Sequence, residues 1–221
     1  MSPISSALRI DAWSHLASAQ RRCLELGFQV VPCPWHASLN AIQITLPPGA
    51  QVTQTEDLAL VGSAEQGFLD LAMQGKLPLG VPICSLTPCF RQGDVGPFHH
   101  PYFLKLELGY FWTQRDPPRM CDLEKIAKDF QDTSRSLHLE AFSIEPSLGE
   151  PQRHIQRSHH GWLWDIPLPD LEYGGVEIGS YGARCWSSFD HQHHIRWAYG
   201  PRMAMPRAFD ALKFTPRRKS H

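Results

Sequence analysis

Four features of the sequence could contact phosphate groups, a flat base and a divalent cation. Arg91 carries a planar guanidinium suited to bidentate contact with a phosphate. Phe103 offers a ring on which a base can stack. Glu177, three residues before Ser180, supplies oxygen ligands of the kind that Mg²⁺ prefers. Arg207, at the expected start of a helix, adds a second positive charge where a phosphate is already favoured.

Each of these residues also has a purely structural interpretation, which the sequence leaves open. An arginine in a hairpin often forms a surface ion pair. Phe103 can belong to the core, and Glu177 can point to water. The chemistry therefore depends on whether the fold brings the four features together.

The histidines give a weaker signal. His99 and His100, with Asp94 nearby, could ligate a metal, but neighbours on a strand point to opposite faces, so only one of the two is expected to face a site. The remaining pairs and triplets lack tight metal-ligand spacing, and we interpret them as polar loop residues: His159, His160, His191, His193 and His194. Zinc binding is a minor alternative, and no nucleophile signature is present.

A predicted hairpin positions the first two features. β-branched and aromatic residues over 83–91 and 102–112 predict two strands, and turn formers between them predict a loop. Arg91 closes the first strand and Phe103 opens the second. The hairpin is therefore the element around which a site would be built.

Length and composition indicate a single globular domain. The chain has 221 residues, of which 42% are hydrophobic and 19% charged, and its formal net charge is −1. This charge argues against a surface dominated by nucleic-acid phosphates. We find no apolar run near the roughly 20 residues of a membrane span and no signal-peptide pattern, so we expect a cytoplasmic protein. The six cysteines, without a CxxC pair, are expected to be buried thiols.

The N-terminal half predicts helices and strands in alternation. A helix is expected over 7–26, ended by Gly27, and then an edge strand over 28–31 before Pro32 and Pro34. Strands are predicted over 41–46 and 58–61. Ser63 is the expected N-cap of the next helix, which places Glu65 in its first turn.

The C-terminal half continues the mixture. We predict a helix over 119–137, a strand over 139–144, a mobile polar insertion over 145–160, a buried segment over 162–166, strands over 174–184 and 195–200, and a helix over 206–214. This order favours an α+β domain built on a largely antiparallel sheet.

The hairpin resembles motif 2 of the class II aminoacyl-tRNA synthetases. That motif has an arginine closing one strand and a phenylalanine and an acid on the return strand, matched here by Arg91, Phe103 and Glu107. The run FLKLE is similar to the seryl enzymes, and HHPYF to the phenylalanyl enzymes. The resemblance is thus to the superfamily.

Other family elements also have counterparts. Residues 27–34, with GF and a closing proline, resemble motif 1 at the dimer interface. The GSAE segment is similar to the element that holds the substrate's amino group, which implies that Glu65 does so here. Glu177 and Ser180 match the element that binds Mg²⁺ and ATP, and Gly179 between them is implied to contact the substrate.

Motif 3 is present in altered form in GPRMAMPR, residues 200–207. Arg207 occupies the place of the family arginine. Arg202 and Ala204 stand where two glycines are expected, and Pro206 replaces an acid. A large side chain at Arg202 could crowd ATP or reach a phosphate itself.

The resemblance covers residues 11–214 and implies a class II catalytic domain, an antiparallel sheet flanked by helices, between a flexible end at 1–10 and a basic tail at 215–221. It implies ATP and Mg²⁺ as cofactors, an amino acid as substrate and a homodimer paired through residues 27–34. Arg91 and Arg207 would be the catalytic residues. Phe103 would stack on adenine, and His99 or His100 would steady the outer phosphates.

No anticodon-binding domain is expected, so the implied enzyme is a free-standing ligase that activates an amino acid. Its acceptor is left open: a tRNA acceptor end, a carrier protein, a small molecule or a modified nucleotide. One alternative is an inactive synthetase paralogue that senses a ligand or binds a partner, which Arg202 favours. Another is a metal-binding protein that uses the histidine clusters.

Overall fold

The computed structural model describes residues 10–92, 96, 98, 100–113, 118–150, 156–158 and 161–213. The expected flexible end at 1–10 lies outside these residues except for Ile10, which is helical. The basic tail, His99 and much of the predicted insertion also lie outside them.

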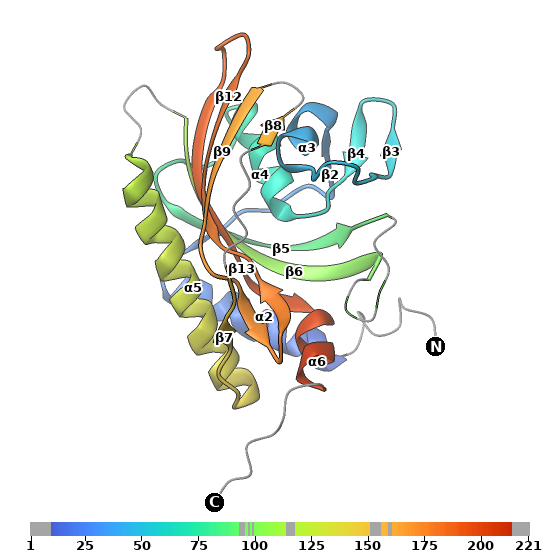
Figure 1. Cartoon of the computed structure of the whole chain (residues 1–221), viewed down its shortest axis with the longest axis vertical. Helices are drawn as coiled ribbons and strands as arrows, with labels where there is room; N and C mark the ends of the chain where they lie inside the picture. The colour runs from blue at the N-terminus through green and yellow to red at the C-terminus, as the bar shows by residue number, and fades with distance from the viewer. Residues whose placement is uncertain are drawn as a thin grey trace, which may run out of the picture.

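A seven-stranded sheet forms the centre of the molecule (Figure 1). Its order is β1 (Gln29–Val30), β5 (Pro82–Phe90), β6 (Tyr102–Trp112), β13 (His194–Met205), β12 (Gly182–Ser188), β9 (Gly161–Pro167) and β8 (Gln156–Ser158). Every neighbouring pair is antiparallel except β1 with β5. The predictions of an α+β fold, a largely antiparallel sheet and an edge strand before Pro32 are therefore confirmed.

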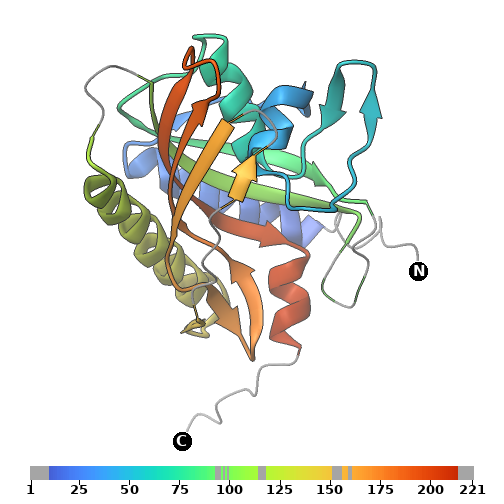
Figure 2. The same cartoon turned by 45° about the horizontal axis from the view of Figure 1, so that its top comes forward.

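Two long helices cover one face of this sheet. α2 (Ile10–Glu25) and α5 (Met120–Phe142) lie across β5, β6 and β13 in both views (Figures 1 and 2). Their apolar stripes pack against alternate residues of the strands, for example Leu104, Leu106 and Leu108 of β6. Burial of this apolar surface is the main term that stabilises the layer.

The opposite face carries a second, separate core. α3 (Leu39–Thr45) and α4 (Ala64–Met73) pack beside a small sheet of β2 (His36–Ser38), β4 (Leu58–Leu60) and β3 (Gln54–Thr55). Phe68 of α4 meets Phe111 of β6 edge to face, and Phe111 stacks on Trp197 of β13. This core covers only part of the face.

A third sheet completes the molecule beside α6 (Arg207–Leu212). It consists of β11 (Val176–Gly179), β10 (Leu171–Tyr173) and β7 (Ser147–Leu148). The uncovered part of the large sheet is thus flanked by α4 and by β11 with α6.

Several predicted elements were wrong. Residues 41–46 are mostly helical, because Ser38 caps α3 by accepting from the amide of Ala41 and the short apolar run does not distinguish helix from strand. Residues 139–142 continue α5, which ends at Ser143 with a left-handed φ of 55°. The predicted strand over 174–184 is two strands, β11 and the start of β12.

Two burial predictions also need correction. In β9 only Leu163 and Gly161 are buried, whereas Trp162 and Trp164 are 49% and 47% exposed because period-two alternation sends them to the other face. All six cysteines are free, as predicted, but Cys121 is exposed and Cys33 is only half-buried.

The two central strands direct their polar side chains to the uncovered face. On β6 the odd-numbered residues Phe103, Lys105 and Glu107 point away from the α2 and α5 layer. On β13 the register shifts between Pro201 and Met203, so that Arg202 is an extra, bulged residue.

The bulge places Arg202 and Met203 on the same face of the sheet. Met203 and Arg202 face the helix layer, where Arg202 is only 3% exposed and lies near Cys23, Tyr181 and Glu140. Arg202 does not line the uncovered face. The prediction that it crowds ATP or reaches a phosphate is therefore wrong.

Candidate functional site

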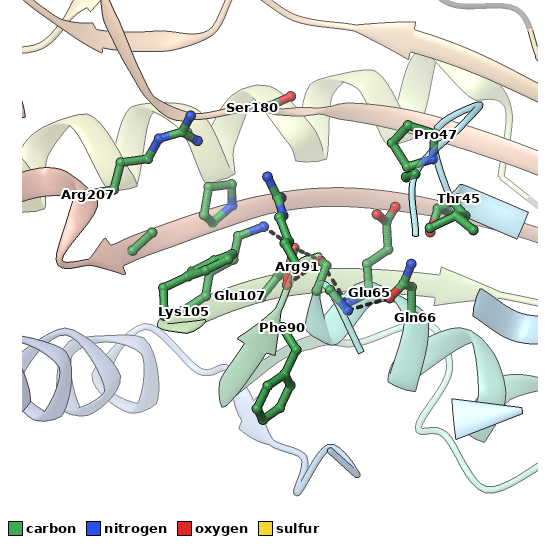
Figure 3. Close-up of a pocket in the computed structure, with 18 of the residues that line it drawn as sticks. Thr45, Pro47, Glu65, Gln66, Phe90, Arg91, Lys105, Glu107, Ser180 and Arg207 are labelled. Carbon is green, nitrogen blue, oxygen red and sulfur yellow. Dashed lines mark hydrogen bonds and ion pairs between the residues drawn. The ribbon is translucent and has the colours of Figure 1, made fainter. Parts of the chain in front are cut away.

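A cavity of about 500 Å³ opens on the uncovered face of the large sheet (Figure 3). Its walls come from α4, the ends of β5 and β6, β11, β12, β13 and the start of α6, together with the segment after α3. The predicted site residues that line it are Glu65, Arg91, His100, Phe103, Glu107, Glu177, Gly179, Ser180 and Arg207. His99 is outside the described residues. The fold thus brings together residues that are up to 142 positions apart in the sequence.

Arg91 and Phe103 lie side by side at one end of this cavity. The amide of Arg91 donates to the carbonyl of Pro101, 3.0 Å away, which fixes the backbone where the strand pair ends. The Arg91 guanidinium carbon lies 5.2 Å from the centroid of the Phe103 ring, a cation–π distance. The guanidinium therefore lies over one face of the ring, and this end of the cavity offers a cationic and an aromatic contact, as suits a base joined to phosphates.

Glu107 is a buried acceptor between three donors. Its carboxylate accepts from Ser63 Oγ at 2.7 Å, from the Ala64 amide at 2.7 Å and from Lys105 Nζ at 2.7 Å. Ser63 is the N-cap of α4, as predicted, and accepts from the Glu65 amide. Glu107 therefore ties the first turn of α4 to β6 and holds the Lys105 ammonium beside the cavity.

Two opposing effects set the acidity of Glu107. Burial disfavours the charged form, but the Lys105 ammonium and the donated hydrogen bonds of Ser63 and Ala64 favour it more strongly, so the pKa of Glu107 is lowered. The Lys105–Glu107 pair contributes no net charge to the cavity. Whether Glu107 also contacts a nucleotide stays a prediction.

Glu65 is buried and already bonded to protein groups. Arg184 NH1 donates to both of its carboxylate oxygens, at 2.8 and 2.9 Å, and Trp197 Nε1 donates to Oε1 at 2.6 Å. Burial raises the pKa of Glu65, and the Arg184 guanidinium acts against this effect. Oε1 thus has two donors and Oε2 has one, which leaves Oε2 able to accept another hydrogen bond.

Arg184 links Glu65 to a second acid on the next strand. Its Nε and NH2 lie 2.9 Å from Asp165 Oδ2, and the guanidinium carbon lies 4.0 Å over the ring of Tyr199. The Tyr199 hydroxyl donates to Asp165 Oδ1 at 3.1 Å. These contacts form a continuous hydrogen-bonded wall, from α4 across β12 and β9 to β13, at the inner end of the cavity.

Glu177, Ser180 and Arg207 form the opposite wall. Arg207 NH1 lies 3.4 Å from Glu177 Oε1, and the Glu177 side chain is 42% exposed. Burial and the neighbouring Glu177 charge raise the pKa of Asp170 to about 6, while hydrogen bonding with Ser180 acts against them. Two carboxylates and a hydroxyl are therefore grouped where the cavity meets solvent.

This group fits Mg²⁺ better than a transition metal. Carboxylate and hydroxyl oxygens suit a hard cation, which completes its shell with water and phosphate oxygens. Nowhere in the part of the chain that the structure describes do three histidine, cysteine, aspartate or glutamate side chains converge as a metal site. The histidine clusters thus provide no such site among these residues.

His100 is held at the rim by α6. Its Nε2 lies 2.9 Å from Asp210 Oδ2, and Lys213 also pairs with Asp210. His100 borders the cavity near Arg207, on the side of the predicted outer phosphates. Its contact with a phosphate stays a prediction.

Position 179 has no room for a side chain, because Tyr181 lies close to the Gly179 backbone. A Cβ at Gly179 would lie 2.7 Å from the Tyr181 hydroxyl, and one at Gly200 would lie 2.2 Å from the Tyr181 ring. The hydroxyl donates to the Pro201 carbonyl at 2.7 Å. The two glycines therefore let β11 approach β13 and keep this wall of the cavity thin.

Three residues of the site were not foreseen from the sequence: Arg184, Asp165 and Asp170. Arg184 lies in a predicted strand, but its partners are 119 and 19 positions away, and no local spacing relates them. Only strand pairing, with Arg184 opposite Asp165, reveals the network.

Comparisons with known proteins agree with this architecture. No family model and no curated protein matches the sequence. Among solved structures, two of a pyrrolysyl-tRNA synthetase from Desulfitobacterium hafniense match with a TM-score of 0.53 and 17% and 18% identity, covering 91% of this chain and 68% of that one. No helix among the described residues is long and apolar enough to cross a membrane.

The chain has the fold of the catalytic domain of class II aminoacyl-tRNA synthetases, as its motifs predicted.

Proposed function

We propose that the protein is a ligase that activates an amino acid with ATP. A carboxylate oxygen of the amino acid attacks the α-phosphorus of ATP, the bond from that phosphorus to the bridging oxygen breaks, and pyrophosphate leaves. The product is an aminoacyl adenylate. The aminoacyl group then passes to an acceptor, which is either a molecule other than tRNA or a tRNA of which the protein recognises only a part, such as the acceptor end.

The observation that carries this proposal is the convergence of the motif residues on one cavity. Arg91, Phe103 and Arg207 come from separate elements of the synthetase-type fold and all line it, with Glu65 at its inner end. A surface arginine or a core phenylalanine would not require this arrangement. The cavity holds both a flat cationic surface for a nucleotide and a buried acid for an amine.

Each residue then has a defined task. Arg91 holds the α-phosphate in line with the attacking carboxylate, and Phe103 stacks on adenine. Arg207 steadies the outer phosphates with His100 or His99. Such catalysis depends mainly on positioning and on neutralising charge that develops in the transition state.

Glu177 and Ser180 would hold Mg²⁺, with Asp170 beside them. The ion supplies charge neutralisation of the phosphate oxygens when bound. The 3.4 Å contact between Glu177 and Arg207 also keeps the Arg207 guanidinium beside this cation site.

Glu65 accepts the substrate ammonium through Oε2, the oxygen that has a single protein donor. Gly179 provides close approach of the β11 backbone to the substrate. The Arg184 and Trp197 donors keep the Glu65 carboxylate oriented before the substrate arrives.

The inactive paralogue was favoured by Arg202 alone. Since Arg202 faces the helix layer rather than the cavity, that support is removed.

Two copies are proposed to pair through α2 and β1. Several large apolar side chains in and next to these elements are between 40% and 61% exposed: Trp13, Leu24, Leu26, Val30 and Trp35. β1 is also the free edge of the large sheet. An apolar edge of this kind is suited to a partner of the same chain.

Pyrophosphate exchange tests the activity. The purified protein should catalyse exchange of pyrophosphate into ATP with at least one amino acid, and Arg91→Ala should lower that rate by about 100-fold or more while the circular dichroism spectrum is unchanged. Arg119→Ala, at a side chain that is 79% exposed, is the control. No exchange with any amino acid, together with no ATP binding by calorimetry, would rule out the function.

A further inference from the structure

We propose that Arg184 is the specificity-determining residue of the cavity and restricts the substrate to amino acids with an uncharged side chain. The inference rests on the proposed function, and it concerns a residue that matches no family motif described above. It follows from the contacts and the charges at the inner wall.

Arg184 is held by three neighbouring side chains. Glu65 and Asp165 accept its hydrogen bonds, Tyr199 lies under its plane, and its side chain is only 19% exposed. A guanidinium has five N–H donors, and not all of them are used by the two acids. The planar group therefore cannot swing away without breaking buried ion pairs, and it forms a fixed part of the wall.

The wall holds one more acidic than basic side chain. Glu65 and Asp165 are acids, and Arg184 is the base between them. The nearby Lys105 and Glu107 cancel each other. An excess charge in a buried site is unfavourable, so the wall favours a ligand that brings one positive charge.

The ammonium of an amino acid supplies that charge at Glu65. A neutral side chain then leaves the wall balanced. A basic side chain would add a second cation beside a guanidinium that cannot move, and an acidic one would restore the negative excess. Each mismatch acts at short range in a site with little solvent, where charge interactions are strong.

The same argument predicts how substitutions shift the preference. Arg184→Met removes the base and raises the negative excess, which favours basic amino acids. Asp165→Asn removes an acid, which favours acidic ones. The double variant has the net charge of the wild type and should again prefer neutral amino acids, whereas Arg184→Lys retains the charge and should keep the wild-type preference at lower activity.

Pyrophosphate exchange with neutral, basic and acidic amino acids measures these preferences as ratios of kcat/KM. We expect each single charge variant to move its ratio by about tenfold or more in the stated direction, and the double variant to return it. Opposite shifts from two contacting residues would not arise from a general loss of structure. Thermal unfolding identifies any variant that fails to fold, in which case the remaining variants are compared.

Two results would overturn the inference. One is wild-type exchange with a basic or acidic amino acid at least as fast as with any neutral one. The other is an unchanged preference in the folded charge variants. An absence of exchange with every amino acid would instead reject the proposed function, and this inference with it.

Discussion

Glu107→Ala is the substitution that the structure predicts to be the most damaging to stability at the site. The carboxylate is 1% exposed and accepts from Ser63, from the Ala64 amide and from Lys105. Its removal leaves a backbone donor at the start of α4 and a largely buried ammonium without their acceptor. Both losses act at the junction of α4 with β6.

The expected cost can be estimated from these contacts. Removing one partner of a buried ion pair costs about 3–5 kcal/mol, and an orphaned buried donor costs about 1–3 kcal/mol. The terms overlap, and deleting the acid also removes its own burial penalty. We therefore expect a loss of about 3–5 kcal/mol in the free energy of unfolding, which is a large fraction of a typical 5–15 kcal/mol.

Urea unfolding followed by circular dichroism measures this loss. With a slope of about 3 kcal/mol per molar urea, the midpoint should fall by about 1–1.7 M. Glu107→Gln, which keeps an acceptor but not the charge, should lose less. Glu25→Ala is the matched control, because its pair with Arg22 joins side chains that are about half exposed, and its midpoint should be unchanged.

The pH dependence provides a second check. The pKa of Glu107 is lower in the folded state than in the unfolded state. The ionised carboxylate therefore stabilises the fold above the ordinary glutamate pKa of about 4.3, and this stabilisation is lost as the pH falls below that value. The difference between wild type and Glu107→Ala should therefore narrow in acid. A midpoint shift below about 0.3 M at neutral pH, or an equal shift in Glu25→Ala, would refute the reasoning.

Three further predictions follow. Arg202→Met should raise the free energy of unfolding by about 1–3 kcal/mol, because Nε and NH1 of this buried arginine have no hydrogen-bond partner among the described residues; a lower urea midpoint would contradict this. Burial lowers the pKa of His138 to about 4, so its neutral form is favoured by folding, and stability should decline by roughly 1.4 kcal/mol per pH unit as the pH falls from about 6.5 towards 4. His138→Gln should flatten that decline in urea titrations, and an unchanged slope would assign it to other groups. Val30→Asp should convert a dimer to a monomer in analytical ultracentrifugation, because Val30 is 40% exposed on the edge strand; a monomeric wild type would reject the proposed pairing.

Local signals were sufficient for much of the fold. The hairpin strands at 82–90 and 102–112, the Ser63 cap and the edge strand before Pro32 all follow from turn residues, capping and proline chemistry within a few positions. Elements were assigned wrongly where a short apolar run fits both the helical period of 3.6 residues and the strand period of two. Residues 41–46 are the example, since the cap at Ser38 and the packing of α3 decide the outcome.

The bulge at Arg202 shows a different limit. Counted back from Ala204, which lines the cavity, regular alternation would place Arg202 on the cavity face; the inserted residue breaks this alternation, so that Arg202 and Met203 both face the helix layer. No local feature of the sequence GPRMAMPR predicts the β-bulge at Arg202. It is visible only when β13 is paired with β6.

By itself the sequence determined which residues could do chemistry and the elements that carry them, because residue type and local spacing control rotamers, caps and turns. The residues of motif 2, with Glu65, Glu177, Ser180 and Arg207, were identified from their types or from the resemblance to class II motifs, and each lines the cavity. Only the tertiary structure decided which charges meet. Arg184 joins Glu65 and Asp165 through strands and a helix distant in sequence, and it is this burial of three charges together that sets the electrostatic character of the site.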